Sequence, residues 1–112
     1  MAKNILSSDT VVIASSGTTS TSIVMERNRV PLAIVTPAAL TGTTIKFQVA
    51  LHSEATTFYP LYNEGTEYSV TVNTSRYIAL NPDVFQGVSV VRLVSGSSEA
   101  ASRTISVVSG EL

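Results

Sequence analysis

The stretch Thr44-Ile45-Lys46-Phe47-Gln48-Val49-Ala50-Leu51-His52 decides the fold class of this chain. Its side chains alternate with a period of two, so that one face carries Ile45, Phe47, Val49 and Leu51. Successive side chains of a β-strand point to opposite faces, whereas those of a helix repeat every 3.6 residues. The stretch therefore predicts a β-strand that buries one apolar face.

Similar short segments extend in both directions, separated by turn signals at intervals of about eight to twelve residues. Tyr68, Val70 and Val72 alternate inward, and Asn81-Pro82 begins a single helical turn. The predicted strands are residues 10–14, 21–25, 30–36, 44–52, 57–62, 67–72, 76–80, 88–94 and 104–109. Because parallel sheets need crossover helices, we expect an all-β fold, an antiparallel two-sheet β-sandwich, jelly-roll-like, with eight or nine short strands.

The composition favours the same fold class. Val, Ile and Thr make up 36 of the 112 residues, and their stiff side chains favour a pleated sheet. Charged residues make up only 13% of the chain, whereas Ser and Thr together occupy 30 positions. We expect a single domain over residues 10–112, preceded by a flexible N-terminal arm over residues 1–9. The segment 26–29 reads as a charged turn.

Charge and cysteine usage argue against several classes of function. Seven basic and eight acidic residues leave a net charge of −1, without any Lys/Arg run, so we expect no nucleic-acid partner. No apolar stretch approaches the ~18 residues of a membrane span, so we expect no membrane partner. The chain contains no Cys and therefore no disulfide framework.

Catalytic chemistry finds little basis in the sequence. His52 is the only histidine, and we expect it to end a strand on its polar face as a solvated side chain. The alternatives are a metal or acid–base pair with Glu54 on the same strand face, or a hydrolase site with Ser53. A structural zinc site needs four ligands, which one His cannot complete without Cys or a second His. Glu64 and Glu67 lie at one hairpin end and lack the facing geometry of a glycosidase pair. We therefore expect no enzyme, no catalytic residue, no metal and no cofactor.

The aromatic side chains leave two interpretations open. Tyr59 and Tyr62, with Phe58, could form a stacking platform for a sugar ring. Alternatively, the same residues are core and rim packing of a small sandwich, because no cluster of Asp, Asn and Trp accompanies them.

Several predicted strands carry apolar side chains on both faces, although a sandwich strand needs only one. Two apolar faces indicate either a covered outer side or contact with another protein. The low charge favours such contact, because little repulsion opposes it. The candidate contact residues are Pro31, Ala33, Val35, Val91 and Leu93.

Short phrases in a fixed order resemble a known family. They are Thr41–Gln48, Phe58-Tyr59-Pro60-Leu61-Tyr62, Gly65–Val72, Ser75–Pro82, Val91–Gly96 and Ala101–Ile105. Over residues 15–108 the chain is similar to the capsid decoration proteins of tailed bacteriophages, also called cement or staple proteins.

The resemblance implies a non-enzymatic virion structural protein. Such a protein is made in the host bacterial cytoplasm and binds the outer surface of an expanded capsid. Its partner would be the major capsid protein, whose subunits it bridges, and it would be a homo-oligomer, a dimer or a trimer, matching the lattice symmetry. The alternative is a receptor- or glycan-binding β-sandwich module of the phage tail or baseplate.

Overall fold

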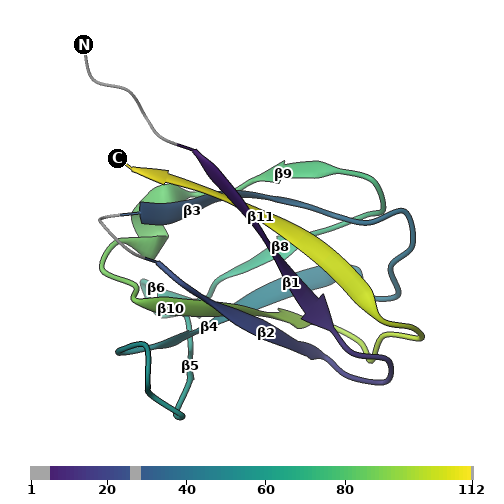
Figure 1. The fold of residues 1–112 in the computed structure, drawn as a ribbon, viewed down its shortest axis with the longest axis horizontal. Coiled ribbons are helices and arrows are strands. Elements are labelled where there is room, and N and C mark those ends of the chain that lie inside the picture. Colours follow the sequence, from purple (N-terminus) through teal and green to yellow (C-terminus); the bar gives the residue numbers. More distant parts are fainter. Residues whose placement is uncertain (1–5, 26–28, 112) are drawn as a thin grey trace.

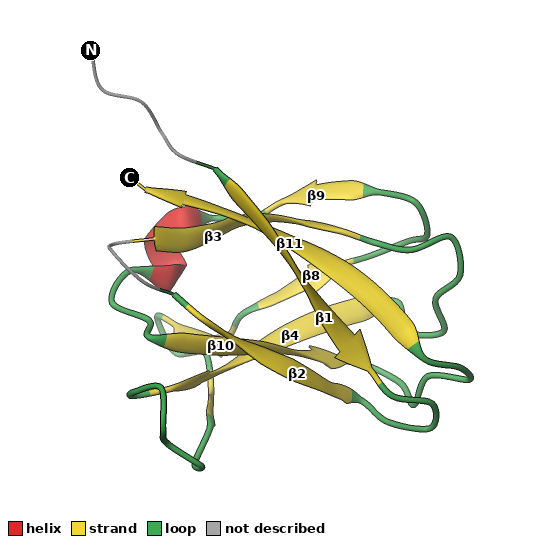
Figure 2. Cartoon of the chain, in the orientation of Figure 1, coloured by secondary structure: helices red, strands yellow, loops and turns green. Residues whose placement is uncertain are grey.

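The computed structural model describes residues 6–25 and 29–111 of the chain. Nearly all regular structure is β (Figures 1 and 2), and the one helical element of the described residues is the short 3-10 helix η1 (Pro82–Phe85). The strands are β1 (Ser7–Ile13), β2 (Thr19–Val24), β3 (Arg29–Val35), β4 (Thr44–Ala50), β5 (Tyr59–Pro60), β6 (Tyr62–Asn63), β7 (Thr66–Glu67), β8 (Ser69–Thr71), β9 (Tyr77–Ala79), β10 (Val90–Ser95) and β11 (Arg103–Glu111).

Strand β4 confirms the alternation from which the fold was predicted. Ile45 and Phe47 are buried, and Val49 packs against the same core, while Lys46 is exposed. The predicted strand is two residues too long, because β4 ends at Ala50. Leu51 therefore lies in the following turn and is 71% exposed instead of joining the core.

Nine strands of the described residues form one antiparallel sheet, in the order β5-β4-β10-β2-β1-β11-β3-β9 with β8 beside β4. A separate ribbon pairs β6 with β7. Strands β1 and β2 share only the pair Ile13–Ser20, beyond which they diverge, and the sheet curls so that its halves face each other (Figure 1). The predicted all-β antiparallel fold is confirmed. The predicted separation into two sheets is not, because the β1–β2 pair joins both halves.

Both halves of the curled sheet contribute to one core. Phe47 lies at its centre, with ring centroids 5.7 Å from Tyr68 and 5.1 Å from Phe85. The rings of Phe47 and Phe85 meet edge to face, an arrangement that aromatic pairs prefer. The buried apolar side chains are Val11, Ile13, Met25, Val30, Ile34, Ile45, Phe47, Leu61, Val72, Leu80, Phe85, Val91, Leu93, Ile105 and Val107.

The predicted helical turn is confirmed, with the cap that the sequence indicates. The side chain of Asn81 accepts a hydrogen bond from Asp83 N at 3.1 Å, and Pro82 follows as the first helical residue. Proline suits this position because its missing N–H would have no helical partner. The turn places Phe85 in the core.

The chain ends differ from the predicted boundaries. The expected arm over residues 1–9 is too long, because Ser7, Ser8 and Asp9 already belong to β1 and pair with Ser109, Val108 and Val107 of β11. Residues 1–5 of that arm, and residues 26–28 of the predicted charged turn, lie outside the described residues. Pairing with β11 gives the backbone N–H and C=O groups of this segment their hydrogen-bond partners. The polar composition of the segment does not indicate this pairing.

Candidate functional site

Most of the predicted contact residues lie inside this chain. Val91 and Leu93 are fully buried core residues, so their assignment to a protein contact is wrong. Pro31 and Ala33 are also buried, and Val35 is half-buried. Of the five, only Val35 presents a side chain of appreciable exposure.

The covering of β10 explains why both of its faces are apolar. Val91 points into the core, and Val90, on the opposite side, is only 3% exposed. The loop between β4 and β5 brings Phe58 to this outer side, where the guanidinium of Arg92 lies 3.9 Å from the ring centroid. Gln48 Oε1 accepts a hydrogen bond from Arg92 Nε at 2.8 Å. A loop of the same chain therefore lies over this part of the strand.

The strand register identifies a different exposed surface, which four neighbouring strands form. On β1, β11, β3 and β9, the positions that alternate with the core residues Val11, Ile105 and Ile34 point outward and lie side by side. We call this surface the uncharged face; its residues are Ser8, Thr10, Val12, Val35, Tyr77, Ala79, Thr104, Ser106 and Val108, whereas Ala33, on the same alternation, is buried.

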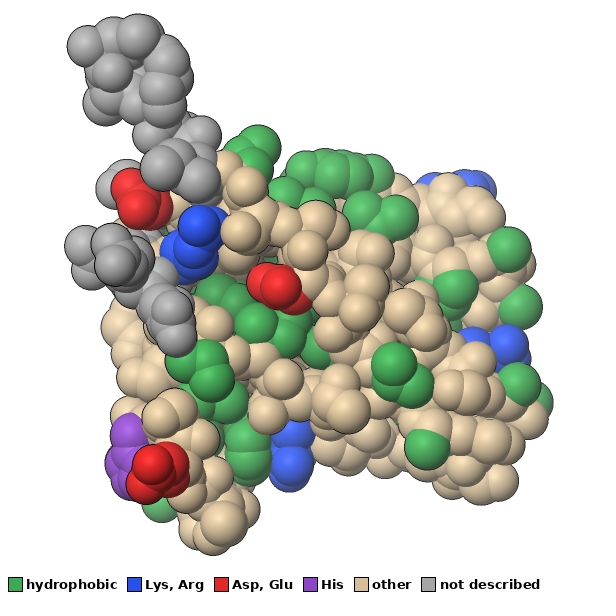
Figure 3. All heavy atoms as spheres, viewed as in Figure 1, with side chains coloured by type: hydrophobic (Ala, Val, Ile, Leu, Met, Phe, Trp, Pro, Cys, Tyr) green, Lys and Arg blue, Asp and Glu red, His purple; other side chains and the backbone are tan. Residues whose placement is uncertain are grey.

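None of these side chains is charged. Of the four charged residues of these strands, Asp9, Arg103 and Glu111 take the alternation of the core residues, and Arg29 is the first residue of β3, beyond the register shift between β11 and β3. In Figure 3, charged side chains are sparse on the visible side and lie mostly toward its margins. The opposite half of the sheet differs, because Lys46 and Arg92 occupy its outward positions.

One buried acid, Glu99, holds together the loops at one end of the sheet. Glu99 is 1% exposed. Its carboxylate accepts hydrogen bonds from the backbone N–H groups of Thr41 at 2.8 Å and Gly42 at 2.9 Å, from Ser95 Oγ at 2.7 Å and from Arg103 Nε at 2.9 Å. Burial alone would raise the pKa of Glu99, but these hydrogen bonds outweigh it and lower the pKa to about 2.

The backbone of Glu99 holds a third loop. Its carbonyl accepts a hydrogen bond from Ser16 N at 2.7 Å, and its N–H donates to the carbonyl of Gly17 at 2.9 Å. A Cβ at Gly42 would collide with Ser95 Oγ, so the approach of these loops requires glycine. With its oxygens occupied, Glu99 acts as a structural residue. Sequence analysis missed it, because an isolated acid in a Gly/Ser loop looks like an ordinary solvated residue.

His52 does not end a strand as expected, because β4 stops at Ala50, and it shares no strand face with Glu54. Both follow β4 in an exposed turn, in which the Ala55 N–H donates to the His52 carbonyl at 3.0 Å. No hydrogen bond joins the side chain of His52 to Ser53 or Glu54 in this described loop. Among the described residues, no group of three or more His, Cys, Asp or Glu side chains is placed to hold a metal ion.

The other carboxylates are also separated. Glu67 pairs with Lys46 across 3.3 Å, and Glu64 is exposed in the turn of the β6–β7 ribbon. The aromatic residues divide into two groups. Phe47, Tyr68 and Phe85 belong to the core, whereas Tyr59, Tyr62 and Tyr77 are exposed.

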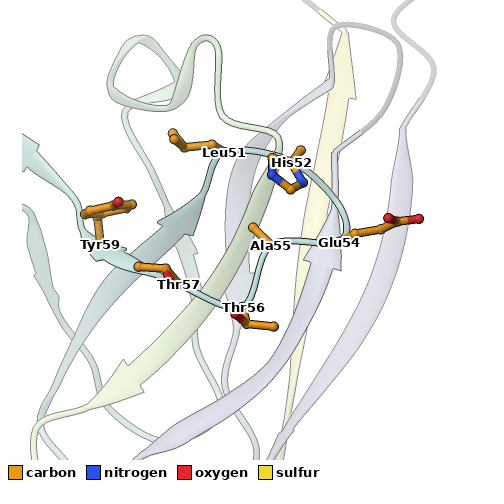
Figure 4. A pocket seen from close by; sticks show the side chains of 7 residues that line it. All are labelled: Leu51, His52, Glu54, Ala55, Thr56, Thr57 and Tyr59. Carbon is orange, nitrogen blue, oxygen red and sulfur yellow. The ribbon is translucent and has the colours of Figure 1, made fainter.

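The loop between β4 and β5, with the start of β5, borders an open surface hollow of about 380 Å³ (Figure 4). Its lining residues are Leu51, His52, Glu54, Ala55, Thr56, Thr57 and Tyr59. Tyr59 belongs to this lining and Tyr62 does not, so the hollow does not bring together the two tyrosines of the platform interpretation.

No family model matches the chain, and no curated protein matches it. Within residues 6–25 and 29–111, no helix has the length and apolar character that a membrane span requires.

Proposed function

We propose that this protein is a decoration protein of a tailed bacteriophage, which binds the outside of the expanded capsid and bridges its subunits. The proposal combines the sequence resemblance with one structural observation, the uncharged face. A docking surface without charge avoids the cost of removing ions from water. Its short hydroxyl and apolar side chains also lose little conformational freedom on contact.

The strand pairing supports a finer description of the fold. We infer that the curled sheet is a jelly roll, in which the first of eight main strands pairs with the last, the second with the seventh, and so on inward. The pairs β1–β11, β2–β10, β3–β9 and β4–β8 follow this scheme. Jelly rolls occur in viral capsid proteins and in lectins, and this analogy favours both candidate functions, capsid decoration and glycan binding.

The size of the uncharged face bears on the oligomeric state. Four strands about 4.8 Å apart, with outward residues over about five positions, give on the order of 300 Å². A standard stable interface buries about 800 Å² per partner. One copy would therefore bind weakly, whereas a dimer or trimer on a symmetry axis of the capsid would gain from several linked contacts. Preferential binding to the expanded shell would stabilise that state by mass action.

The copy number of the protein in purified virions of the source phage tests the proposal. Quantitative mass spectrometry, normalised to the major capsid protein, should give a simple ratio to the capsid subunits. A handful of copies per particle would instead favour the tail or baseplate module. Absence from the virion would overturn both.

A further inference from the structure

The loops at the two ends of β4 differ in the hydrogen bonding of their polar side chains. At one end, the carboxylate of Glu99 is satisfied by hydrogen bonds from Thr41, Gly42, Ser95 and Arg103. At the opposite end of β4, the β4–β5 loop leaves its polar side chains unpartnered. Within this described loop, His52, Glu54, Thr56, Thr57 and Tyr59 form no side-chain hydrogen bond or ion pair.

The hollow has an apolar wall and a polar wall. Figure 4 shows Leu51 and Tyr59 on one side and the imidazole of His52 on the other, with the carboxylate of Glu54 turned outward at the rim. The apolar wall is accessible, because Leu51 is 71% and Tyr59 50% exposed. Backbone pairing of Tyr59 with Val49 holds the ring at the edge of the sheet.

We propose that this hollow binds a neutral hexopyranose ring of a glycan. The C–H face of a pyranose can pack on the aromatic face of Tyr59, and its hydroxyl groups can pair with His52 and Thr57. The lining combines the apolar side chains of Leu51, Ala55 and Tyr59 with a larger share of polar ones, which suits a ligand with many hydroxyl groups. The carboxylate of Glu54 at the rim disfavours acidic sugars, because like charges repel.

The site lies in the half of the sheet formed by β2, β10, β4 and β8, away from the uncharged face. Docking through the uncharged face would leave the hollow open to solvent. The inference goes beyond capsid decoration and does not depend on it, since it concerns the isolated chain.

Titration of the ¹⁵N-labelled full chain with methyl glycosides of glucose, galactose and mannose, followed by amide NMR, tests the proposal. We expect saturable shifts confined to residues 51–59 for at least one sugar, with Kd in the millimolar range or tighter, and none for N-acetylneuraminic acid. Free monosaccharide and glycan sources are distinguished by a trisaccharide of the binding sugar. Tighter binding of the trisaccharide supports a glycan, and equal or weaker binding overturns the assignment to a glycan.

Tyr59→Ala should weaken binding about tenfold or more, since it removes the apolar ring on which the C–H face of the sugar would pack. Tyr62→Ala is the matched control, because Tyr62 is 57% exposed but does not line the hollow. His52→Ala provides a second lining variant should Tyr59→Ala fold poorly. Absence of saturable shifts with all three sugars, or equal weakening by Tyr62→Ala, would overturn the assignment. Neither result affects the proposed capsid role.

Discussion

Glu99 Oε2 lies 2.9 Å from the backbone nitrogen of Gly42, although 57 positions separate the two residues in the chain. This hydrogen bond ties the loop before β4 to the loop after β10. Since the Glu99 backbone also binds Ser16 and Gly17, three loops meet at one residue. The geometry of this end of the curled sheet therefore depends on a single buried carboxylate.

Replacement of the carboxylate should destabilise the fold. Glu99→Gln removes the charge that Arg103 and the two backbone N–H groups face, and we expect a loss of about 2–3 kcal/mol in the free energy of unfolding. Urea denaturation measures it. The control Glu64→Gln, at an exposed turn position, should change stability by less than about 0.5 kcal/mol. Equal effects of the two changes would contradict the structural role of Glu99.

The free energy of unfolding should decrease in acid, because Glu99 becomes protonated. The folded pKa of Glu99, about 2, lies below the ordinary value of 4.5, so the unfolded chain binds more protons between these pH values. The contribution is complete above about pH 5 and declines as the pH falls toward 2. Urea denaturation from pH 2 to 7 should show the difference between wild type and Glu99→Gln shrinking below pH 4.5. A constant difference over that interval would be incompatible with a lowered pKa.

Position 42 should tolerate only glycine, because Ser95 Oγ lies where a Cβ would be. Gly42→Ala places a methyl group against Ser95 Oγ, and overpacking of this kind costs about 1–3 kcal/mol. Ser95→Ala alone loses the hydrogen bond to Glu99. In the double variant the clash is relieved, so the two costs should not add, and a double-mutant cycle in urea measures the coupling. Strict additivity would show that the two sites do not interact.

A charge on the uncharged face should impair capsid binding if the proposed function holds. Thr10→Glu introduces a carboxylate in the middle of β1, which docking would have to desolvate, so binding to expanded capsids should weaken about tenfold or more. Thr71→Glu on β8 is the control, because that residue is also exposed and lies on the opposite half of the sheet. Co-sedimentation with capsids lacking the protein measures both. Similar binding by the two variants would exclude the uncharged face as the docking surface.

Sequence patterns predicted the local elements well. Alternation around Phe47 identified β4 and its buried face, and Asn81-Pro82 identified the short helix, because both signals depend on neighbouring residues only. Apolar side chains on both sides of β10 were interpreted as a protein contact, and Val91 and Leu93 were misassigned. Burial under a loop and burial under a partner remove the same apolar surface from water, so the pattern cannot separate them.

The sequence by itself determined that the chain is all-β, because strand alternation and β-branched composition act locally. Only the tertiary structure decided which strands adjoin, where the uncharged face lies, and that Glu99 is buried. Each of these depends on contacts between distant segments, such as Glu99 with Thr41 at a separation of 58 positions. A hydrogen bond of that kind stabilises the fold only after the sheet has brought both loops together, so no short window of sequence contains it.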